Sequence, residues 1–413
     1  MSAPPALIYL DNHATTRLDP RVLEAMLPWL TDHYGNAGSV THDLGREARA
    51  AVDTARDTFA AAVGATAREI VFTSGATESA NLALLGSAAR LLTEGRRGHV
   101  ITIATEHHAV LDPLEHLERT GVAVTRLPVV GQQDGDGIPG RIRLADLEAA
   151  FRPDTFLVAV LLANNEIGVV QDVAAIAERT HARGALLHVD CAQAMGRMRV
   201  DVDALAADLA SFSGHKFHGP KGAGALYVRR RGRAVRLEPL VHGGGQERGL
   251  RSGTLDVPAI VGLAMAAQLA NDGLADDVPR IRGLRDRLWS RLEATVPGIA
   301  VNGPAVDATD QGDAFVRLAN NLNVRIPGVD GQSLLAALSA AGLAASSGSA
   351  CSAESPRPSH VLLGLGLTDD EARASVRFGL SRFTTTAEID VAADRVAAGV
   401  AELRGLCLRG GAG

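Results

Sequence analysis

The chain has 413 residues, of which 46% are hydrophobic and 21% charged, and its formal net charge is −6. This length exceeds what one hydrophobic core usually serves, so we expect a globular protein of two packed domains. The negative charge provides no basic field for nucleic acid, and no uncharged segment is long enough to cross a membrane, so we expect neither as a partner.

Short β-branched runs alternate with alanine-rich helical stretches from Tyr9 onward, which is typical of an α/β fold with a mostly parallel sheet. Six runs are predicted strands: 69–73, 99–103, 155–160, 185–190, 209–213 and 224–228. Because these runs are almost continuously apolar, we expect helices on both faces of the sheet. Helices dominate from about Asn271, which predicts a smaller second domain there.

The three cysteines, Cys191, Cys351 and Cys407, are widely spaced and form no Cys-x-x-Cys pair. This pattern argues against a disulfide framework and against a structural zinc site. The first ten residues lack the basic and apolar regions of a secretion signal. We therefore expect a cytoplasmic protein that has no metal site.

Polar residues follow several predicted strands directly. In open α/β sheets, chemistry gathers beyond the carboxyl ends of the strands, so we expect these residues to converge. They are Thr73-Ser74-Gly75, Glu106-His107, Asn164-Asn165, Asp190 and His215-Lys216.

Lys216 lies between a predicted strand and the glycine-rich turn that ends at Gly222. A pyridoxal-phosphate enzyme needs an amine to bond the cofactor aldehyde and a carboxylate to keep the pyridine nitrogen protonated. Lys216 and Asp190 are the candidates for these roles.

The segment from Ser74 to Ser79 joins a strand to a helix and could bind a phosphate with its free N–H groups. A routine helix cap explains the same segment. Ser213 and His215, which lie close to the lysine in the sequence, favour the cofactor interpretation. His107 could stack on a planar ring and relay protons, or be a hydrogen-bonded loop histidine.

Cys351 lies in a run of small residues from Ser346 to Glu354, which predicts a mobile loop able to carry a reactive thiol. Cys191 follows an apolar strand and should pack as a small hydrophobic residue. Arg377 alternates with apolar residues, so we expect it to face inward toward an anion, either a substrate carboxylate or a structural partner.

Together these segments resemble the cysteine desulfurases of the nitrogen-fixation and iron–sulfur-cluster type, in the class V aminotransferase branch of fold-type-I pyridoxal-phosphate enzymes. The resemblance covers nearly the whole chain. It runs through Tyr9-Leu10-Asp11-Asn12, 14–16, 74–79, 105–107, 164–168, 188–190 with Gln193, 211–222, 243–248, 346–351 and 375–382.

The resemblance implies a large domain over 14–270 that contains a seven-stranded sheet. It also implies a smaller α+β domain from 1–13 and 271–413, which carries the cysteine loop at about 344–359. The cofactor would be bound by Ala76, Thr77, His107, Asn165, Asp190, Gln193, Ser213, His215, Lys216 and, from the second subunit of a homodimer, Thr254. Arg377, Asn165 and Asn36 would bind the substrate, and Asn165 and Gln193 would touch either the substrate or the phenolic oxygen of the cofactor.

The implied activity removes sulfur from L-cysteine, gives L-alanine and leaves a persulfide on Cys351 for a sulfur-acceptor protein such as an iron–sulfur scaffold. Lys216, Cys351 and His107 would be the catalytic residues. Another class V enzyme, a selenocysteine lyase or an aminotransferase, is the alternative, and it would not need the cysteine loop. Three positions depart from the family pattern: His13 stands where asparagine is common, Cys191 where alanine is usual, and 355–359 reads Ser-Pro-Arg-Pro-Ser.

Overall fold

The computed structural model describes residues 7–93, 95–308, 316–347 and 357–410, without the side chains of 407–410. Cys351 and the side chain of Cys407 therefore lie outside the described residues.

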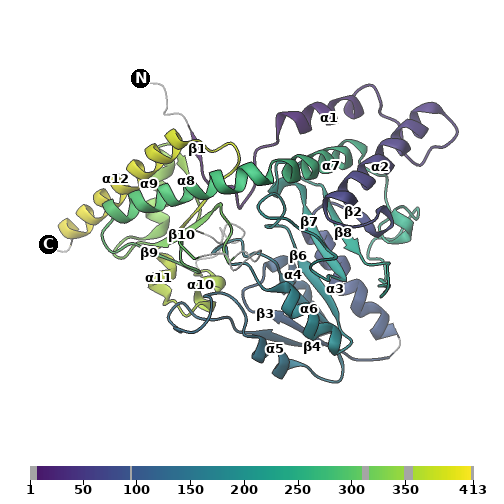
Figure 1. Cartoon of the computed structure of the whole chain (residues 1–413), viewed down its shortest axis with the longest axis horizontal. Coiled ribbons are helices and arrows are strands. Elements are labelled where there is room, and N and C mark those ends of the chain that lie inside the picture. Colours follow the sequence, from purple (N-terminus) through teal and green to yellow (C-terminus); the bar gives the residue numbers. More distant parts are fainter. Residues whose placement is uncertain (1–6, 94, 309–315, 348–356, 411–413) are drawn as a thin grey trace.

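A seven-stranded sheet organises the larger part of the molecule (Figure 1). Its strand order is β2-β8-β7-β6-β5-β3-β4, and β8 runs antiparallel to the other six strands. The strands are β2 (Ile70–Thr73), β3 (His99–Ile103), β4 (Ala123–Leu127), β5 (Thr155–Leu161), β6 (Leu186–Asp190), β7 (Leu209–Ser213) and β8 (Gly224–Val228). The predicted α/β class and mostly parallel sheet are confirmed. The six predicted strands agree with the structure to within one residue, whereas β4 was not predicted.

Helices cover both faces of this sheet because alternate residues of each strand point to opposite sides. In β5, Leu157 and Ala159 pack with α3 (Ala76–Thr93) and α4 (His108–Arg119). Val158 and Val160 belong instead to the core on the other face. That core also contains residues of α2 (Asp43–Ala62), α5 (Leu144–Ala150), α6 (Val173–Ala182) and α7 (Val257–Asp272), while α1 (Pro20–Leu30) lies along α7.

A second hydrophobic core lies in the C-terminal part, where the strands form a three-stranded antiparallel sheet, β12-β10-β9, and a parallel pair, β1-β11. These strands are β1 (Ile8–Tyr9), β9 (Ala300–Val301), β10 (Asn321–Arg325), β11 (Leu343–Ala344) and β12 (Ser375–Gly379). The helices are α8 (Leu274–Thr295), α9 (Gly331–Ala340), α10 (His360–Gly364), α11 (Asp369–Arg373) and α12 (Thr386–Gly410).

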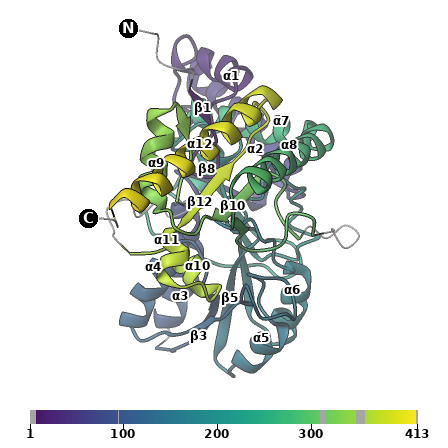
Figure 2. The same ribbon diagram turned by 90° about the vertical axis from the view of Figure 1, so that its left-hand side faces the viewer.

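The first residues of the chain belong to this second core, because Ile8 and Leu10 pack there with α8, α9 and α12. The short helix α10 packs the other way: Val361 and Leu362 join the core of the large sheet. Figure 2 shows α10 and α11 between the small sheet, with β10 and β12, and strands β3 and β5 of the large sheet. This packing supports the domain division at about residues 13 and 271, which stays a prediction.

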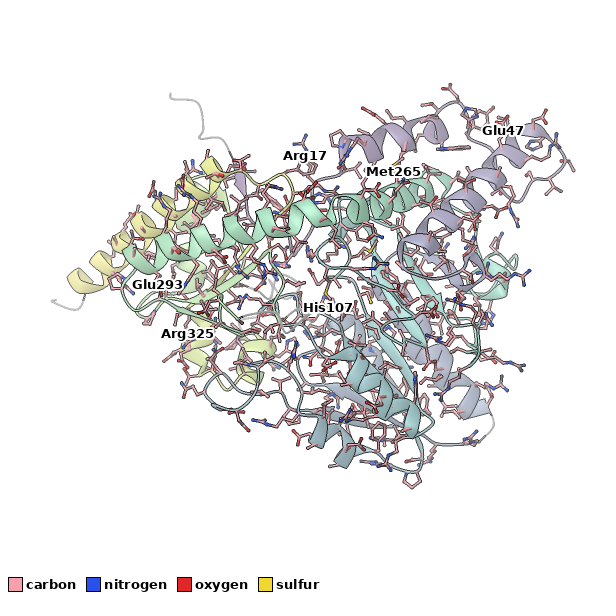
Figure 3. All side chains as sticks on the ribbon, viewed as in Figure 1. Arg17, Glu47, His107, Met265, Glu293 and Arg325 are labelled. Carbon is pink, nitrogen blue, oxygen red and sulfur yellow. The ribbon has the colours of Figure 1, made fainter. Side chains whose placement is uncertain are left out.

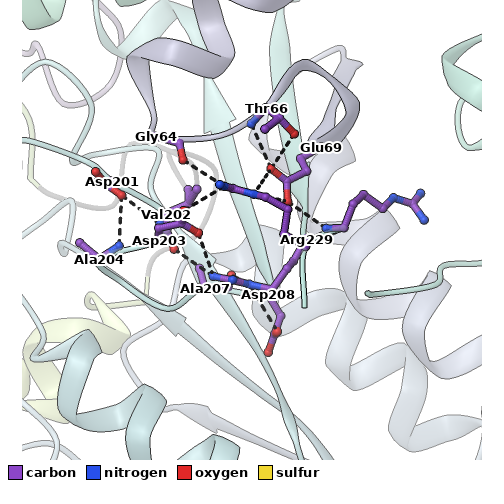
Figure 4. Close-up of polar contacts among 12 residues, drawn as sticks. Gly64, Thr66, Glu69, Asp201, Val202, Asp203, Ala204, Ala207, Asp208 and Arg229 are labelled. Atoms are coloured by element: carbon purple, nitrogen blue, oxygen red, sulfur yellow. Dashed lines mark hydrogen bonds and ion pairs between the residues drawn. The ribbon is translucent and has the colours of Figure 1, made fainter. Parts of the chain in front are cut away.

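The arginines at 229–231 follow β8 at the edge of the sheet opposite the carboxyl ends of the parallel strands. Arg229 lies 3.5 Å from Asp203, and Arg231 lies 3.1 Å from the buried Glu69 (Figure 4 shows the surrounding contacts). Burial alone would raise the pKa of Glu69, but hydrogen bonds, led by that from the Arg230 N–H, lower it to about 2. These arginines therefore hold strand ends together through acidic partners within the chain.

Within the described ranges, no single helix is both long and apolar enough to span a membrane; α7 and α8 meet that criterion only as a pair bent by 73°.

Candidate active site

A cavity of about 920 Å³ opens at the carboxyl edge of the large sheet. Its volume is in the range of pockets that bind small ligands and cofactors. Figure 3 places His107 near the middle of the molecule, between the part that carries Arg325 and the large sheet. The predicted site residues that line the cavity are Ala76, Thr77, His107, Asn165, Asp190, Gln193, Ser213, His215, Lys216 and Arg377. The predicted convergence at the strand ends is therefore what the structure shows.

Lys216 ends a short 3-10 turn that follows β7. Its Nζ donates hydrogen bonds to the carbonyl oxygens of His13, at 2.6 Å, and Ala14, at 2.9 Å. These carbonyls hold the amine in place without adding a formal negative charge next to it. Such an arrangement suits an amine that must react with an aldehyde.

Asp190 is the last residue of β6 and lies buried at the cavity wall. Burial raises the pKa of its carboxyl group, against the opposing effects of the Ala192 N–H, which donates at 2.9 Å, and of the positive charge of Lys216. A buried carboxylate of this kind gains most from a cationic N–H partner. Asp190 can therefore hold a proton on the ring nitrogen of a ligand.

His107 caps the N-terminus of α4, and its Nδ1 accepts a hydrogen bond of 3.0 Å from the Ala109 N–H. Because Nδ1 accepts, the neutral ring carries its proton on Nε2. Burial, followed by the charge of Lys216, lowers the pKa of His107 to about 4. The side chain is therefore a flat, neutral ring at neutral pH, as stacking on a cofactor requires.

Another part of the cavity wall consists of small polar residues and the first turn of α3. Ser74 to Thr77, Ser213 and His215 meet there, and the His215 Nδ1 lies 3.1 Å from the Thr15 hydroxyl. Gly75 and Gly224 allow close packing of the two backbones, because a Cβ at Gly224 would lie 2.5 Å from the Gly75 Cα. The N–H groups of a helix start favour an anion, so this part of the wall suits a phosphate.

Arg377 reaches the cavity from β12 and is 1% exposed. Its Nη2 lies 2.9 Å from Asp11 Oδ1, and its Nη1 donates to the Asn165 carbonyl at 2.9 Å. The inward arginine was predicted correctly, and the ion pair with Asp11 is the structural partner that the sequence left open. Its position in the cavity wall leaves its role with a substrate carboxylate a prediction.

Two predicted residues do not line the cavity. Asn36 is exposed between α1 and α2, where its Oδ1 accepts a hydrogen bond of 2.8 Å from the Gly38 N–H. Thr254 is also exposed, as expected of a residue that would serve a second subunit. The roles of both residues stay predictions.

The cavity wall also includes contacts that the sequence did not predict. The Ser359 hydroxyl donates to Glu166 Oε2 at 2.6 Å, and His360 Nε2 lies 2.8 Å from the carbonyl oxygen of Glu106. Ser359 also caps α10, and a serine before an apolar run is a helix-start signal that could have placed it. Its pairing with Glu166, 193 residues away, has no signal in the sequence.

Residues 8–391 match the model of the Aminotransferase class-V family. The chain belongs to this family. It is 49% identical over 401 residues to the cysteine desulfurase IscS of Escherichia coli, covering 97% of this chain and 94% of that protein. Among solved structures, a NifS-like protein has a TM-score of 0.85 at 36% identity over 95% of this chain and 98% of that one. DndA from Streptomyces lividans has a TM-score of 0.72 at 40% identity, covering 89% and 97%.

Members of this family depend on pyridoxal phosphate, as predicted. The cavity fits this cofactor: a lysine amine, a buried carboxylate and the start of helix α3 with its neighbouring small polar residues lie in its wall. In the described part of the chain, no three His, Cys, Asp or Glu side chains gather into a metal site.

Proposed function

We propose that this class V family member is a cysteine desulfurase, which converts L-cysteine to L-alanine and transfers the sulfur to Cys351. The observation that carries this proposal is the meeting of Lys216, Asp190 and His107 in one cavity. Near-full-length similarity to a cysteine desulfurase at 49% identity supports the choice of substrate.

The chain's own residues divide the work of holding cofactor and substrate. Lys216 would bond the pyridoxal aldehyde, Asp190 would hold the proton on the ring nitrogen, and His107 would stack on the ring. The phosphate would be held by Ala76, Thr77, Ser213 and His215. When bound, pyridoxal phosphate supplies an electron sink for the bond broken at the substrate Cα.

Proton movement falls to Lys216, whose amine would remove the Cα proton of cysteine. The carbonyls of His13 and Ala14, at 2.6 and 2.9 Å, keep this amine at a fixed place in the cavity. Arg377 would neutralise the substrate carboxylate. Its bonds to Asp11 and Asn165 fix the guanidinium group before the substrate arrives.

Sulfur transfer falls to Cys351. Its thiolate would attack the sulfur of cysteine, so that an S–S bond forms, the Cβ–S bond breaks and its electron pair stays with Cβ, which is then protonated to give alanine. The described residues on either side of the cysteine segment support this role. Ser346 pairs with Arg377 through two backbone hydrogen bonds, and Arg357 and Ser359 line the cavity.

A homodimer is supported by exposed apolar side chains on one face of α1. Leu23, Leu27 and Leu30 are 42%, 46% and 56% exposed and follow helical spacing. Exposed Val241 adds to the apolar surface beside the loop that leads to Thr254, since the Ser252 N–H donates to the Val241 carbonyl at 3.2 Å. A second copy of the chain would cover these apolar side chains and bring Thr254 to the phosphate site of its neighbour.

The sulfur acceptor and the location of the enzyme are inferred from the sequence alone. An acceptor protein such as an iron–sulfur scaffold and a cytoplasmic location stay predictions.

The proposal is tested by incubating the purified holoenzyme with L-cysteine and a thiol reductant, without a keto acid, and quantifying alanine and sulfide. We expect both products in equal amounts. The Cys351→Ser variant should keep the cofactor absorbance and lose both products, whereas the matched Cys407→Ser variant should keep them. Alanine formation that requires a keto acid would instead identify an aminotransferase. Undiminished sulfide release by Cys351→Ser would show that the Cys351 thiol does not take part in the reaction.

A further inference from the structure

His13, one of the departures from the family pattern, forms a buried connection between the two parts of the molecule. It is 1% exposed, its Nδ1 lies 3.0 Å from Gln193 Oε1, and its Nε2 lies 3.1 Å from Asn321 Nδ2. Gln193 lines the cavity, whereas Asn321 lies on β10 of the other sheet.

The side-chain amide of Asn321 can have only one orientation. Arg317, which has no acceptor, donates from Nη2 to Asn321 Oδ1 at 3.0 Å. On the other side, Asn321 Nδ2 donates to the Glu166 carbonyl at 2.9 Å. The atom that faces His13 is therefore a donor, so His13 Nε2 must accept.

The amide of Gln193 is fixed in the same way. Arg197 donates from Nη1 to Gln193 Oε1, and Gln193 Nε2 donates to the His13 carbonyl at 3.0 Å. The oxygen of Gln193 thus faces His13, whose Nδ1 must carry the proton. Burial, followed by the charges of Arg197 and Arg377, holds the pKa of His13 well below its usual value, which agrees with a neutral ring that donates from Nδ1 and accepts at Nε2.

The hydrogen bonds therefore run in one direction, from Arg317 through Asn321 and His13 to Gln193. At its end, the Gln193 oxygen already accepts from His13 and Arg197, and the remaining N–H of its amide is the group left to meet a ligand. The packing around His13 leaves little room for the ring to move: a Cβ at Gly379 would lie 2.7 Å from His13 Cδ2.

We propose that His13 is a positioning residue that, together with Arg197, locks the Gln193 amide with its nitrogen toward the phenolic oxygen of pyridoxal phosphate. The inference rests on the proposed cofactor site, but neither on L-cysteine as substrate nor on Cys351. A flipped amide would place its oxygen against the negative phenolic oxygen, so the lock matters whenever that oxygen is ionised.

The test is a pH titration of the visible absorbance of the purified holoenzyme. A donor to the phenolic oxygen stabilises the deprotonated form of the bound cofactor, so losing it raises the titration midpoint. We expect His13→Leu to raise the midpoint by up to about one pH unit, the scale of one hydrogen bond to a charged group, because Arg197 and the main-chain carbonyl of residue 13 still contact the Gln193 amide. His13→Asn, whose amide can still donate to Gln193, should stay near the wild-type midpoint.

Gln193→Ala is the matched comparison. It should raise the midpoint at least as much as His13→Leu does, and the double variant should show no rise beyond that of Gln193→Ala, because both changes act on the same donor. A wild-type midpoint in His13→Leu, or additive shifts in the double variant, would overturn the proposal. A holoenzyme that binds cofactor but does not desulfurate cysteine would reject the proposed function and leave this result intact.

A second measurement does not depend on whether the His13→Leu variant folds. In wild-type holoenzyme with ¹⁵N-labelled histidine, with the signal assigned by its loss in His13→Asn, the ring of His13 should show a protonated Nδ1 and an unprotonated Nε2 at neutral pH. The opposite tautomer would contradict the direction of the hydrogen bonds and the proposal with it.

Discussion

The Asp190→Asn variant tests the proposed cofactor assignment with little change in shape. The amide oxygen of asparagine can still accept the 2.9 Å hydrogen bond from the Ala192 N–H, so the end of β6 should keep its structure. What disappears is the buried negative charge. Removing one partner of a buried charge pair costs about 3–5 kcal/mol, and each factor of ten in rate corresponds to about 1.4 kcal/mol. We therefore expect kcat to fall roughly 10²- to 10⁴-fold.

The assay is the initial rate of alanine release from L-cysteine at saturating pyridoxal phosphate, with bound cofactor measured by absorbance in the same sample. Cys191→Ala is the matched control, because Cys191 is the next residue and is fully buried, with a pKa raised by burial and by Asp190. It should leave kcat nearly unchanged. A cofactor-loaded Asp190→Asn enzyme that loses less than about tenfold in kcat would refute the role given to this carboxylate.

Three further predictions concern substrate binding, stability and pH. Arg377→Lys should raise KM for L-cysteine more than it lowers kcat, because lysine lacks the planar fork that binds a carboxylate in two places; steady-state kinetics measures the split. Glu247→Gln should destabilise the protein by about 3–5 kcal/mol in urea unfolding, since it leaves Arg56, its partner at 2.6 Å, buried and charged. The control Asp53→Asn breaks the exposed pair with Arg49 and should cost about 0–1 kcal/mol. His188, whose pKa burial lowers to about 4, binds a proton more readily in the unfolded chain, so stability should fall as the pH drops from about 6.5 to 4; urea midpoints across this range should depend less on pH in His188→Asn.

The central strands could be predicted from the sequence because helices bury both of their faces and leave long apolar runs. The edge strand β4 could not. It pairs only with β3, four of its five residues are half-buried, and it contains Arg126, which bonds to Glu118. Thr125 and Arg126 interrupt its apolar residues, so it lacks the long apolar run that marks the central strands, although its backbone completes the sheet.

The active site was predictable to the same degree as the strands that carry it. Asp190 ends β6 and His107 comes after β3, two parallel strands of one sheet, so topology alone brings them together. Contacts made across the two sheets are different. The hydrogen bond between Asn321 and His13 joins residues 308 positions apart in the sequence, and the bond between His13 and Gln193 joins residues 180 positions apart. No periodic pattern in the sequence links these three residues. Such contacts depend on tertiary packing and are visible only in the folded molecule.

The most direct test of the central claim is mass spectrometry of the holoenzyme after brief exposure to L-cysteine, before any reductant is added. The account predicts one added sulfur atom on the peptide that contains Cys351, none on the peptide that contains Cys191, and one alanine released for each persulfide formed. Bound cofactor with an unmodified Cys351 and no alanine would contradict it.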